Sequence, residues 1–176
     1  SLTKAAEIRR KIYGPAHTRT LATLLLLSQL YIDSGRPRDA LPVMERVVTE
    51  RRRVLASDHP DLATALTTLG SVYSRLSNDR AAEGAYREAL DVRRRRLTGG
   101  KVLASAIVNL GTVVHRQGRY AESAPLLEEA ARMRLGMHDD TLSGSFCYAL
   151  LAEALLALGR GEEASAWVAH ALASSE

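Results

Sequence analysis

The chain has 176 residues, of which 46% are hydrophobic and 25% charged, and its formal net charge is +4. This composition is typical of a globular protein and excludes a long disordered chain. The single cysteine, Cys147, cannot form an internal disulfide, and the most hydrophobic run, "LATLLLL", is too short to span a bilayer. We therefore expect a cytoplasmic protein without a membrane segment.

Four similar phrases follow one another along the chain. The second begins 42 residues after the first, and the third and fourth each begin 41 residues further on. They read "LSQLYIDSGRPRDALPVMERV", "LGSVYSRLSNDRAAEGAYREAL", "LGTVVHRQGRYAESAPLLEEAA" and "LAEALLALGRGEEASAWVAHA". Each has a residue suited to a tight turn at the same place: Gly35, Ser77, Gly118 and Gly159.

Apolar residues recur at spacings of three and four within every phrase, which predicts two helices separated by the turn. The first helix of each pair, helix A, is expected at about 18–33, 60–76, 102–117 and 141–158. The second, helix B, is expected at about 37–56, 79–97, 120–135 and 161–174. We expect one continuous domain, in which a half repeat at 1–15 precedes repeats at 16–57, 58–98, 99–137 and 138–176.

The second repeat carries the most recognisable pattern. Its Leu69-Gly70, Tyr73, Ala82, Tyr86 and Ala89 resemble the tetratricopeptide signature. The long period and the linkers "IRRKIYGPAHTRTLA" and "RRRVLASDHPDLATAL" are similar to repeats of the kinesin light chain and its bacterial relatives. The resemblance implies an all-α fold, a right-handed α-solenoid of tandem helix-turn-helix repeats.

The resemblance also implies a function. Repeats of this kind form non-catalytic scaffolds that bind a protein or peptide, as an extended segment or a helix, in a concave groove lined by the A helices. We expect such a scaffold here, as a segment of a larger multidomain protein. The outward positions of the A helices, called the groove positions below, are Leu25, Gln29, Thr68, Ser71, Arg75, Asn109, Thr112, Arg116 and Glu153.

Two peptide-binding patterns of the family are not reproduced at these positions. Of the paired asparagines that kinesin light chains carry in helix A, only Asn109 is present, and the Lys, Asn and Arg clamp of chaperone-binding members is absent. Arg75 and Arg116 either hold an acidic side chain of a partner, or are solvated or paired with a glutamate of a neighbouring helix.

The run "DVRRRRLTGG" suggests an acidic or nucleic-acid ligand, but its arginines belong to columns of the repeat. One column consists of Arg9, Arg51, Arg93 and Arg134. Cations in the last turns of B helices interact favourably with the helix dipole, which favours a structural role. The alternative is an exposed basic ridge that binds nucleic acid. With one Phe and one Trp in the chain, base-stacking platforms are missing, and we do not expect nucleic acid as the partner.

No pattern of an enzyme is present. His17, His59 and His138 fall in successive linkers, too far apart to share a metal ion, so no metal site is expected. Cys147 has no histidine at helical spacing and is expected to be a buried, unreactive side chain. We expect neither catalysis nor a cofactor.

A rival function uses the ends of the array. Residues 1–15 align as a B helix without its A partner, and the last B helix carries Trp167 and Leu172 where a polar cap would be expected. These open ends predict either a longer array or a homo-oligomer.

Overall fold

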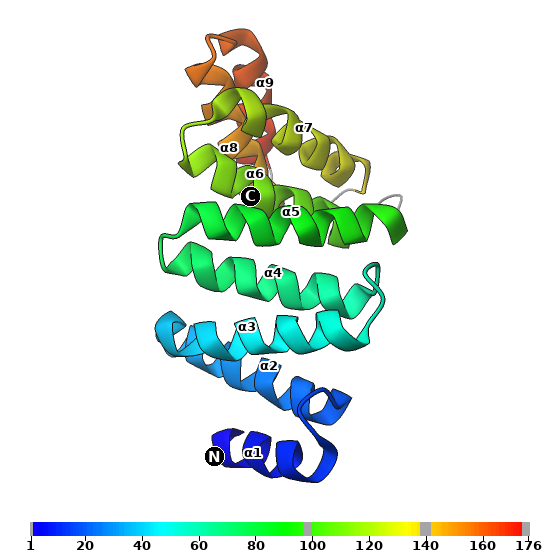
Figure 1. Cartoon of the computed structure of the whole chain (residues 1–176). Coiled ribbons are helices and arrows are strands. Elements are labelled where there is room, and N and C mark those ends of the chain that lie inside the picture. The colour runs from blue at the N-terminus through cyan, green and yellow to red at the C-terminus, as the bar shows by residue number, and fades with distance from the viewer. Residues whose placement is uncertain (1, 97–99, 138–141, 174–176) are drawn as a thin grey trace. The chain divides into compact units, whose positions relative to one another are not determined.

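The computed structural model describes residues 2–96, 100–137 and 142–173, and within these ranges every regular element is an α-helix (Figure 1). The A helices are α2 (Thr18–Asp33), α4 (Pro60–Arg75), α6 (Lys101–Arg116) and α8 (Leu142–Ala157). The B helices are α1 (Leu2–Tyr13), α3 (Pro37–Val54), α5 (Asp79–Arg96), α7 (Tyr120–Gly136) and α9 (Gly161–Ala173). Their bounds confirm the helices expected from the repeat.

The chain folds as two compact units, Ser1–Arg93 and Arg94–Glu176. In unit 1 the helices α1 to α4 stack in chain order, followed by most of α5 (Figure 1). In unit 2, α6 packs against α7, α7 against α8, and α8 against α9. The four repeat boundaries and the single continuous domain expected from the sequence remain predictions.

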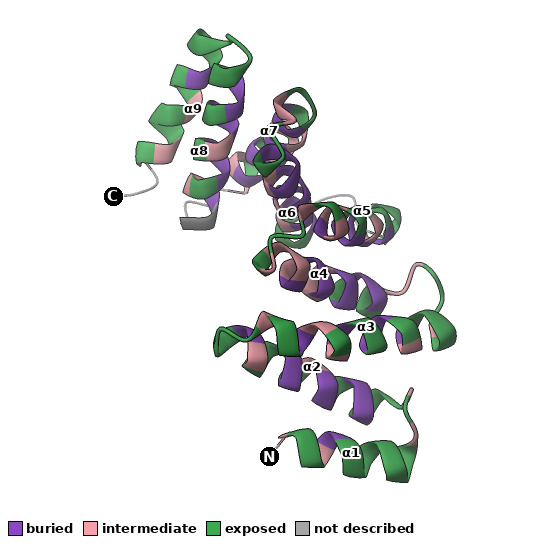
Figure 2. Ribbon diagram, turned by 60° about the vertical axis from the view of Figure 1, so that its left-hand side comes forward, coloured by how far each residue is buried: buried purple, intermediate pink, exposed green. Residues whose placement is uncertain are grey.

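Each unit has a core between its helices (Figure 2). The side chains of Met44, Leu66 and Val72 are at most 1% exposed in unit 1, as are those of Ile107 and Leu127 in unit 2. The small residues at matching places early in the B helices are also buried: Ala40, Ala82, Ser123 and Ala164. Small side chains at these places let neighbouring helices approach closely.

The turn between helices A and B has the same conformation in all four repeats. Gly35, Gly118 and Gly159 have φ of 68°, 73° and 76°, and Ser77 has φ of 58°. A left-handed residue after a helix satisfies its last carbonyls, and glycine adopts it without a steric penalty. The predicted turn residues are confirmed, and Ser77 is the only residue other than glycine with positive φ among those described.

Glycine also permits close contact between helices A and B. A Cβ placed on Gly70 of α4 would lie 2.6 Å from the Tyr86 ring of α5. In unit 2, a Cβ on Gly111 of α6 would lie 2.9 Å from Leu127 Cδ2 of α7. The Leu-Gly pair of the sequence pattern is therefore a packing requirement.

Two A helices begin at a histidine. The Nδ1 atoms of His17 and His59 accept hydrogen bonds from the backbone N–H groups of Arg19 and Asp61, at 3.2 and 3.1 Å. Proline in the first turn of α4 confirms the start predicted there. The sequence did not predict that the histidine ring itself caps the helix. The corresponding residues of the fourth repeat, "HDD" at 138–140, lie outside the described residues.

Candidate peptide-binding groove

The groove positions of unit 1 lie on α2 and α4, and one of them, Leu25, packs against the core. Gln29 and Arg75 are exposed, and Leu25, Thr68 and Ser71 are half-buried. Residues three to four apart on a helix share a face, so Thr68, Ser71 and Arg75 form one stripe along α4.

Two of these side chains already have hydrogen-bond partners. Gln29 Nε2 donates to Asp33 Oδ1 at 2.8 Å, and Thr68 Oγ1 donates to the Thr64 carbonyl at 3.1 Å. A ligand therefore meets an amide on α2 that already donates one hydrogen bond and the methyl group of a threonine on α4. These positions offer contact area more than new hydrogen bonds.

Arg75 differs from them. Among the described residues its guanidinium has neither a hydrogen bond nor an ion pair, and it borders a shallow hollow of about 460 Å³ beside the turn that begins α3. Arg38 lines the same hollow and is also exposed, whereas Arg36 is paired with Asp39 at 2.7 Å. The hollow is thus positively charged.

The groove positions of unit 2 lie on α6 and α8. Asn109 and Thr112 are half-buried, and Arg116 and Glu153 are exposed. The Thr112 hydroxyl donates to the Val108 carbonyl at 2.8 Å. The Asn109 amide is therefore the polar group of α6 most available to a peptide backbone at this stripe.

Glu153 is held by His115, a residue for which no role was predicted from the sequence. His115 Nε2 of α6 lies 3.3 Å from Glu153 Oε2 of α8, and the His115 side chain is 8% exposed. The edge of this imidazole meets the Tyr120 ring at a centroid distance of 5.0 Å. His115 was missed because its role depends on the distance between two A helices, which no local pattern reports.

The first arginine column does not form an exposed ridge. Arg51 and Arg134 are 7% and 3% exposed, Arg93 is half-buried, and only Arg9 is exposed. The alternative of an exposed basic ridge formed by all four arginines is therefore wrong for Arg51 and Arg134, because both are buried. Burial lowers the pKa of Arg51, and the nearby Asp61 carboxylate partly opposes this shift.

Two arginines of the column instead connect a B helix to the next A helix, whereas Arg134 contacts the A helix that precedes it in its own repeat. Arg9 Nη1 donates to the Arg19 carbonyl at 3.4 Å, and Arg51 Nη1 donates to the Asp61 carbonyl, which is again ten residues further on. In unit 2, Arg134 Nη2 lies 3.4 Å from Ser105 Oγ.

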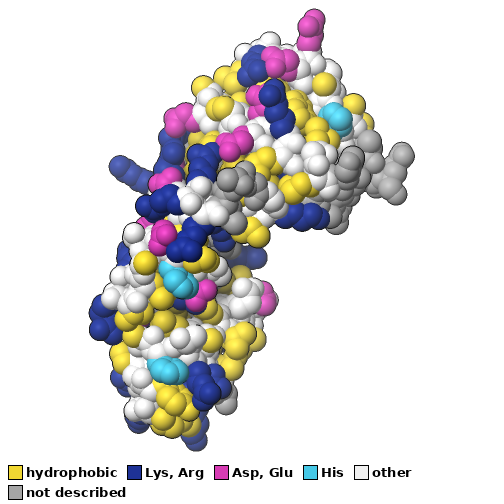
Figure 3. Space-filling model, turned by 90° about the vertical axis from the view of Figure 1, so that its right-hand side faces the viewer, with side chains coloured by type: hydrophobic (Ala, Val, Ile, Leu, Met, Phe, Trp, Pro, Cys, Tyr) yellow, Lys and Arg dark blue, Asp and Glu magenta, His cyan; other side chains and the backbone are white. Residues whose placement is uncertain are grey.

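The next column consists of Arg10, Arg52 and Arg94, which are exposed, and the last two are neutralised by glutamates. Arg52 forms a two-pronged ion pair with Glu88, and Arg94 pairs with Glu129 at 2.6 Å. On the face seen in Figure 3, Lys and Arg side chains alternate with acidic and apolar ones. A continuous basic surface is not visible on this face.

The remaining candidate residues are structural. Cys147 is fully buried and its Sγ lies 3.6 Å from the Leu127 carbonyl oxygen, as a buried thiol was predicted to be. The described residues contain no group of three or more metal-ligating side chains. None of the helices in the described ranges is both long and apolar enough to cross a membrane.

The chain is similar to known repeat proteins. A family model for the tetratricopeptide repeat matches residues 39–95 and 102–176, and a second one matches residues 21–46. A search of curated proteins finds no match.

Solved structures share its fold. A kinesin light chain of Podosopora anserina with nearly identical TPR-like repeats is 20% identical over 99% of this chain and 83% of that one, with a TM-score of 0.84. BtubC (BKLC) from P. vanneervenii is 22% identical over 99% and 73%, with the same TM-score. MamA is 23% identical over 98% and 85%, with a TM-score of 0.73. These similarities establish an all-α solenoid with kinesin-light-chain-like repeats.

Proposed function

Because the chain belongs to the tetratricopeptide repeat family, whose fold serves as a scaffold for protein–protein interaction, we propose that it binds a peptide or partner helix along its A helices. The α2 and α4 stripe and the α6 and α8 stripe each offer a binding surface. The scaffold is non-catalytic and works as part of a larger protein.

The observation that carries this proposal is Arg75. It is an exposed arginine without a partner among the described residues, one turn beyond the half-buried Ser71 and beside a positively charged hollow. Guanidinium groups bind carboxylates through paired hydrogen bonds. The preferred ligand of unit 1 is therefore a segment with an acidic side chain flanked by small or aliphatic residues.

Unit 2 supports the same kind of ligand with different chemistry. Asn109 offers a donor and an acceptor to a peptide backbone, and Arg116 lies on the same helix two turns further on. Glu153 lies on the facing helix α8, where its Oε2 is 3.3 Å from His115 Nε2.

The test is selection of random peptides displayed on phage against the whole chain. Enriched peptides should carry Asp or Glu next to small or aliphatic residues, and Arg75→Glu should reduce their affinity at least tenfold. Arg80→Glu is the matched control, since Arg80 is an exposed arginine of α5 away from the groove positions. Groove binding is wrong if no peptide is enriched, or if Arg75→Glu binds the enriched peptides as tightly as Arg80→Glu does.

A second candidate is self-association, favoured by apolar side chains that the described helices leave exposed. Ile8 and Ile12 of α1 are 47% and 66% exposed, and Val168 and Leu172 of α9 are 40% and 66% exposed. Such side chains mark protein contacts. Light scattering coupled to size exclusion tests this: a concentration-dependent dimer that Ile12→Glu or Leu172→Glu dissociates supports it, and a strict monomer excludes it.

Nucleic-acid binding has the least support. Its proposed ridge includes the buried Arg51 and Arg134, and the exposed Arg52 and Arg94 of the adjacent column are paired with glutamates.

A further inference from the structure

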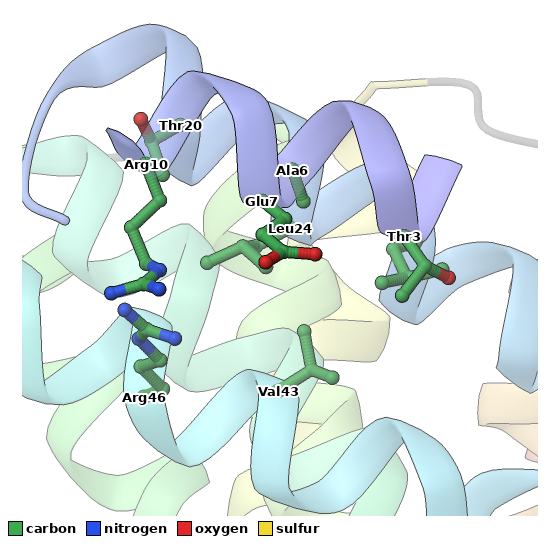
Figure 4. A pocket seen from close by; sticks show the side chains of 9 residues that line it. Thr3, Ala6, Glu7, Arg10, Thr20, Leu24, Val43 and Arg46 are labelled. Carbon is green, nitrogen blue, oxygen red and sulfur yellow. The ribbon is translucent and has the colours of Figure 1, made fainter. Parts of the chain in front are cut away.

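A small pocket lies in unit 1 between α1, α2 and α3 (Figure 4). Its volume is about 240 Å³. The floor is apolar and consists of Ala6, Leu24 and Leu27, which are 5–8% exposed, together with the half-buried Val43. Binding sites for drug-sized ligands and cofactors usually occupy about 300–1,000 Å³. The pocket is therefore suited to one aliphatic side chain rather than to a cofactor.

Two arginines face each other at its rim. Figure 4 shows the guanidinium groups of Arg10 from α1 and Arg46 from α3 pointing toward one another. In the part of the chain that the structure describes, neither has a hydrogen bond or an ion pair. Like charges brought together repel, and an anion between them would remove that repulsion.

The fold accounts for only one of these charges. Arg10 lies in the last turn of α1, where a cation interacts favourably with the helix dipole. Arg46 lies in the middle of α3, where this interaction is absent. The third charged group at the rim, Glu7, is compensated on its own helix by Lys11 at 3.4 Å.

The pocket is separate from the groove positions. Its floor uses Thr20, Leu24 and Leu27 of α2, whereas the groove positions of α2 are Leu25 and Gln29. Gln29 comes nine residues after Thr20, which is two and a half turns at 3.6 residues per turn. The two surfaces therefore lie on opposite sides of α2.

We propose that this pocket is a second docking site, which takes an aliphatic side chain of a partner protein and holds the neighbouring carboxylate between Arg10 and Arg46. The expected ligand is a segment with a leucine followed by a glutamate. The apolar floor is complementary to the leucine side chain, and the paired cations are complementary to the carboxylate. The proposal does not depend on the groove, so a partner protein can occupy both sites together.

The experiment titrates blocked dipeptides into the isotopically labelled whole chain and follows backbone amide chemical shifts. The probes are acetyl-Leu-Glu-amide and its neutral analogue acetyl-Leu-Gln-amide. We expect the acidic peptide to shift the amides of Ala6, Leu24 and Val43 and to bind at least tenfold more tightly than the neutral one. The double variant Arg10→Gln/Arg46→Gln should lose this preference.

Three controls distinguish this site from simpler explanations. Glu7→Gln should strengthen binding of the acidic peptide, since it removes the only carboxylate at the rim. Arg75→Glu and Arg80→Gln should leave it unchanged, which separates the pocket from the groove. The proposal is overturned if inorganic phosphate shifts the same amides as strongly as the acidic peptide, if the two dipeptides bind equally, or if the double variant retains the preference.

Discussion

Arg51 of α3 donates a hydrogen bond to the backbone carbonyl oxygen of Asp61 in the first turn of α4, and its side chain is 9% exposed. Arg9 makes the equivalent bond to Arg19 at the start of α2. The same arginine column thus joins a B helix to the following A helix in two successive repeats. The arginine column that suggests a nucleic-acid site in the sequence is, at these two positions, part of the packing between repeats.

Replacing Arg51 tests this structural role. Arg51→Met removes a hydrogen bond from a charged donor in a buried place, and we expect it to lower the free energy of unfolding by about 1.5–3 kcal/mol. Arg52→Met is the control, because the Arg52–Glu88 pair is exposed and such pairs contribute about 0–1 kcal/mol. Urea unfolding of both variants gives the comparison, and equal losses would contradict the role of Arg51.

The close approach at Gly70 predicts that alanine substitutions at Gly70 and Gly84 have opposite effects on stability. Gly70→Ala should destabilise unit 1 by about 1–3 kcal/mol, because the new Cβ overlaps the buried Tyr86 ring. Gly84→Ala, on the exposed side of α5 with no atom within 4 Å of the new Cβ, should stabilise the chain by about 0.4–1 kcal/mol. Thermal unfolding measures both, and a stabilising Gly70→Ala would disprove the packing argument.

The left-handed conformation of Ser77 predicts that glycine is preferred there. Ser77→Gly should raise the free energy of unfolding by about 0.5–1 kcal/mol, because the Cβ is unfavourable at φ of 58°. The reverse change at the same place of the next repeat, Gly118→Ser, should lower it by a similar amount. Chemical denaturation of the two variants provides the measurement, and a loss of stability in Ser77→Gly would show that the serine side chain itself stabilises the turn.

Burial raises the pKa of the Cys147 thiol to about 11 from its ordinary value of 9.0, with Arg134 partly opposing the shift. Because the thiolate is the reactive form, iodoacetamide at pH 8 should label the native chain far more slowly than the urea-unfolded chain. Mass spectrometry over time measures both rates, and rapid labelling of the native chain would contradict the buried thiol.

The same shift predicts how stability depends on pH. The folded state keeps the thiol protonated where the unfolded chain ionises, so the contribution of this group is complete below pH 9 and is lost as the pH rises toward 11. The Cys147→Ala variant should lack this part of the decline. Unfolding measured at pH 8 and 10 in both proteins tests the difference.

The positions of the helices were predictable from the sequence because each repeat presents the same local signals. Apolar spacing locates helices A and B, and Gly35, Gly118 and Gly159 mark the turns between them. Signals of this kind act over a few residues, and four copies in phase reinforce one another. The start of α4 at Pro60 was found in the same way.

Local signals could not predict which polar side chains are buried and which are paired. The column position of Arg51 and Arg134 indicated a shared role but not that both are buried, since burial depends on how the next repeat covers them. The pairing of His115 with Glu153 joins residues of two different A helices. The pocket between Arg10 and Arg46 likewise requires two B helices, α1 and α3, to pack against the same helix α2.

The sequence by itself thus determined the all-α repeat and the bounds of its helices, because hydrophobic periodicity and turn residues act locally. Only the tertiary structure decided which arginines are buried between repeats and which remain available to a ligand. The physical reason is that burial and ion pairing are set by distances between helices that are far apart in the chain, and these distances follow from packing rather than from local spacing.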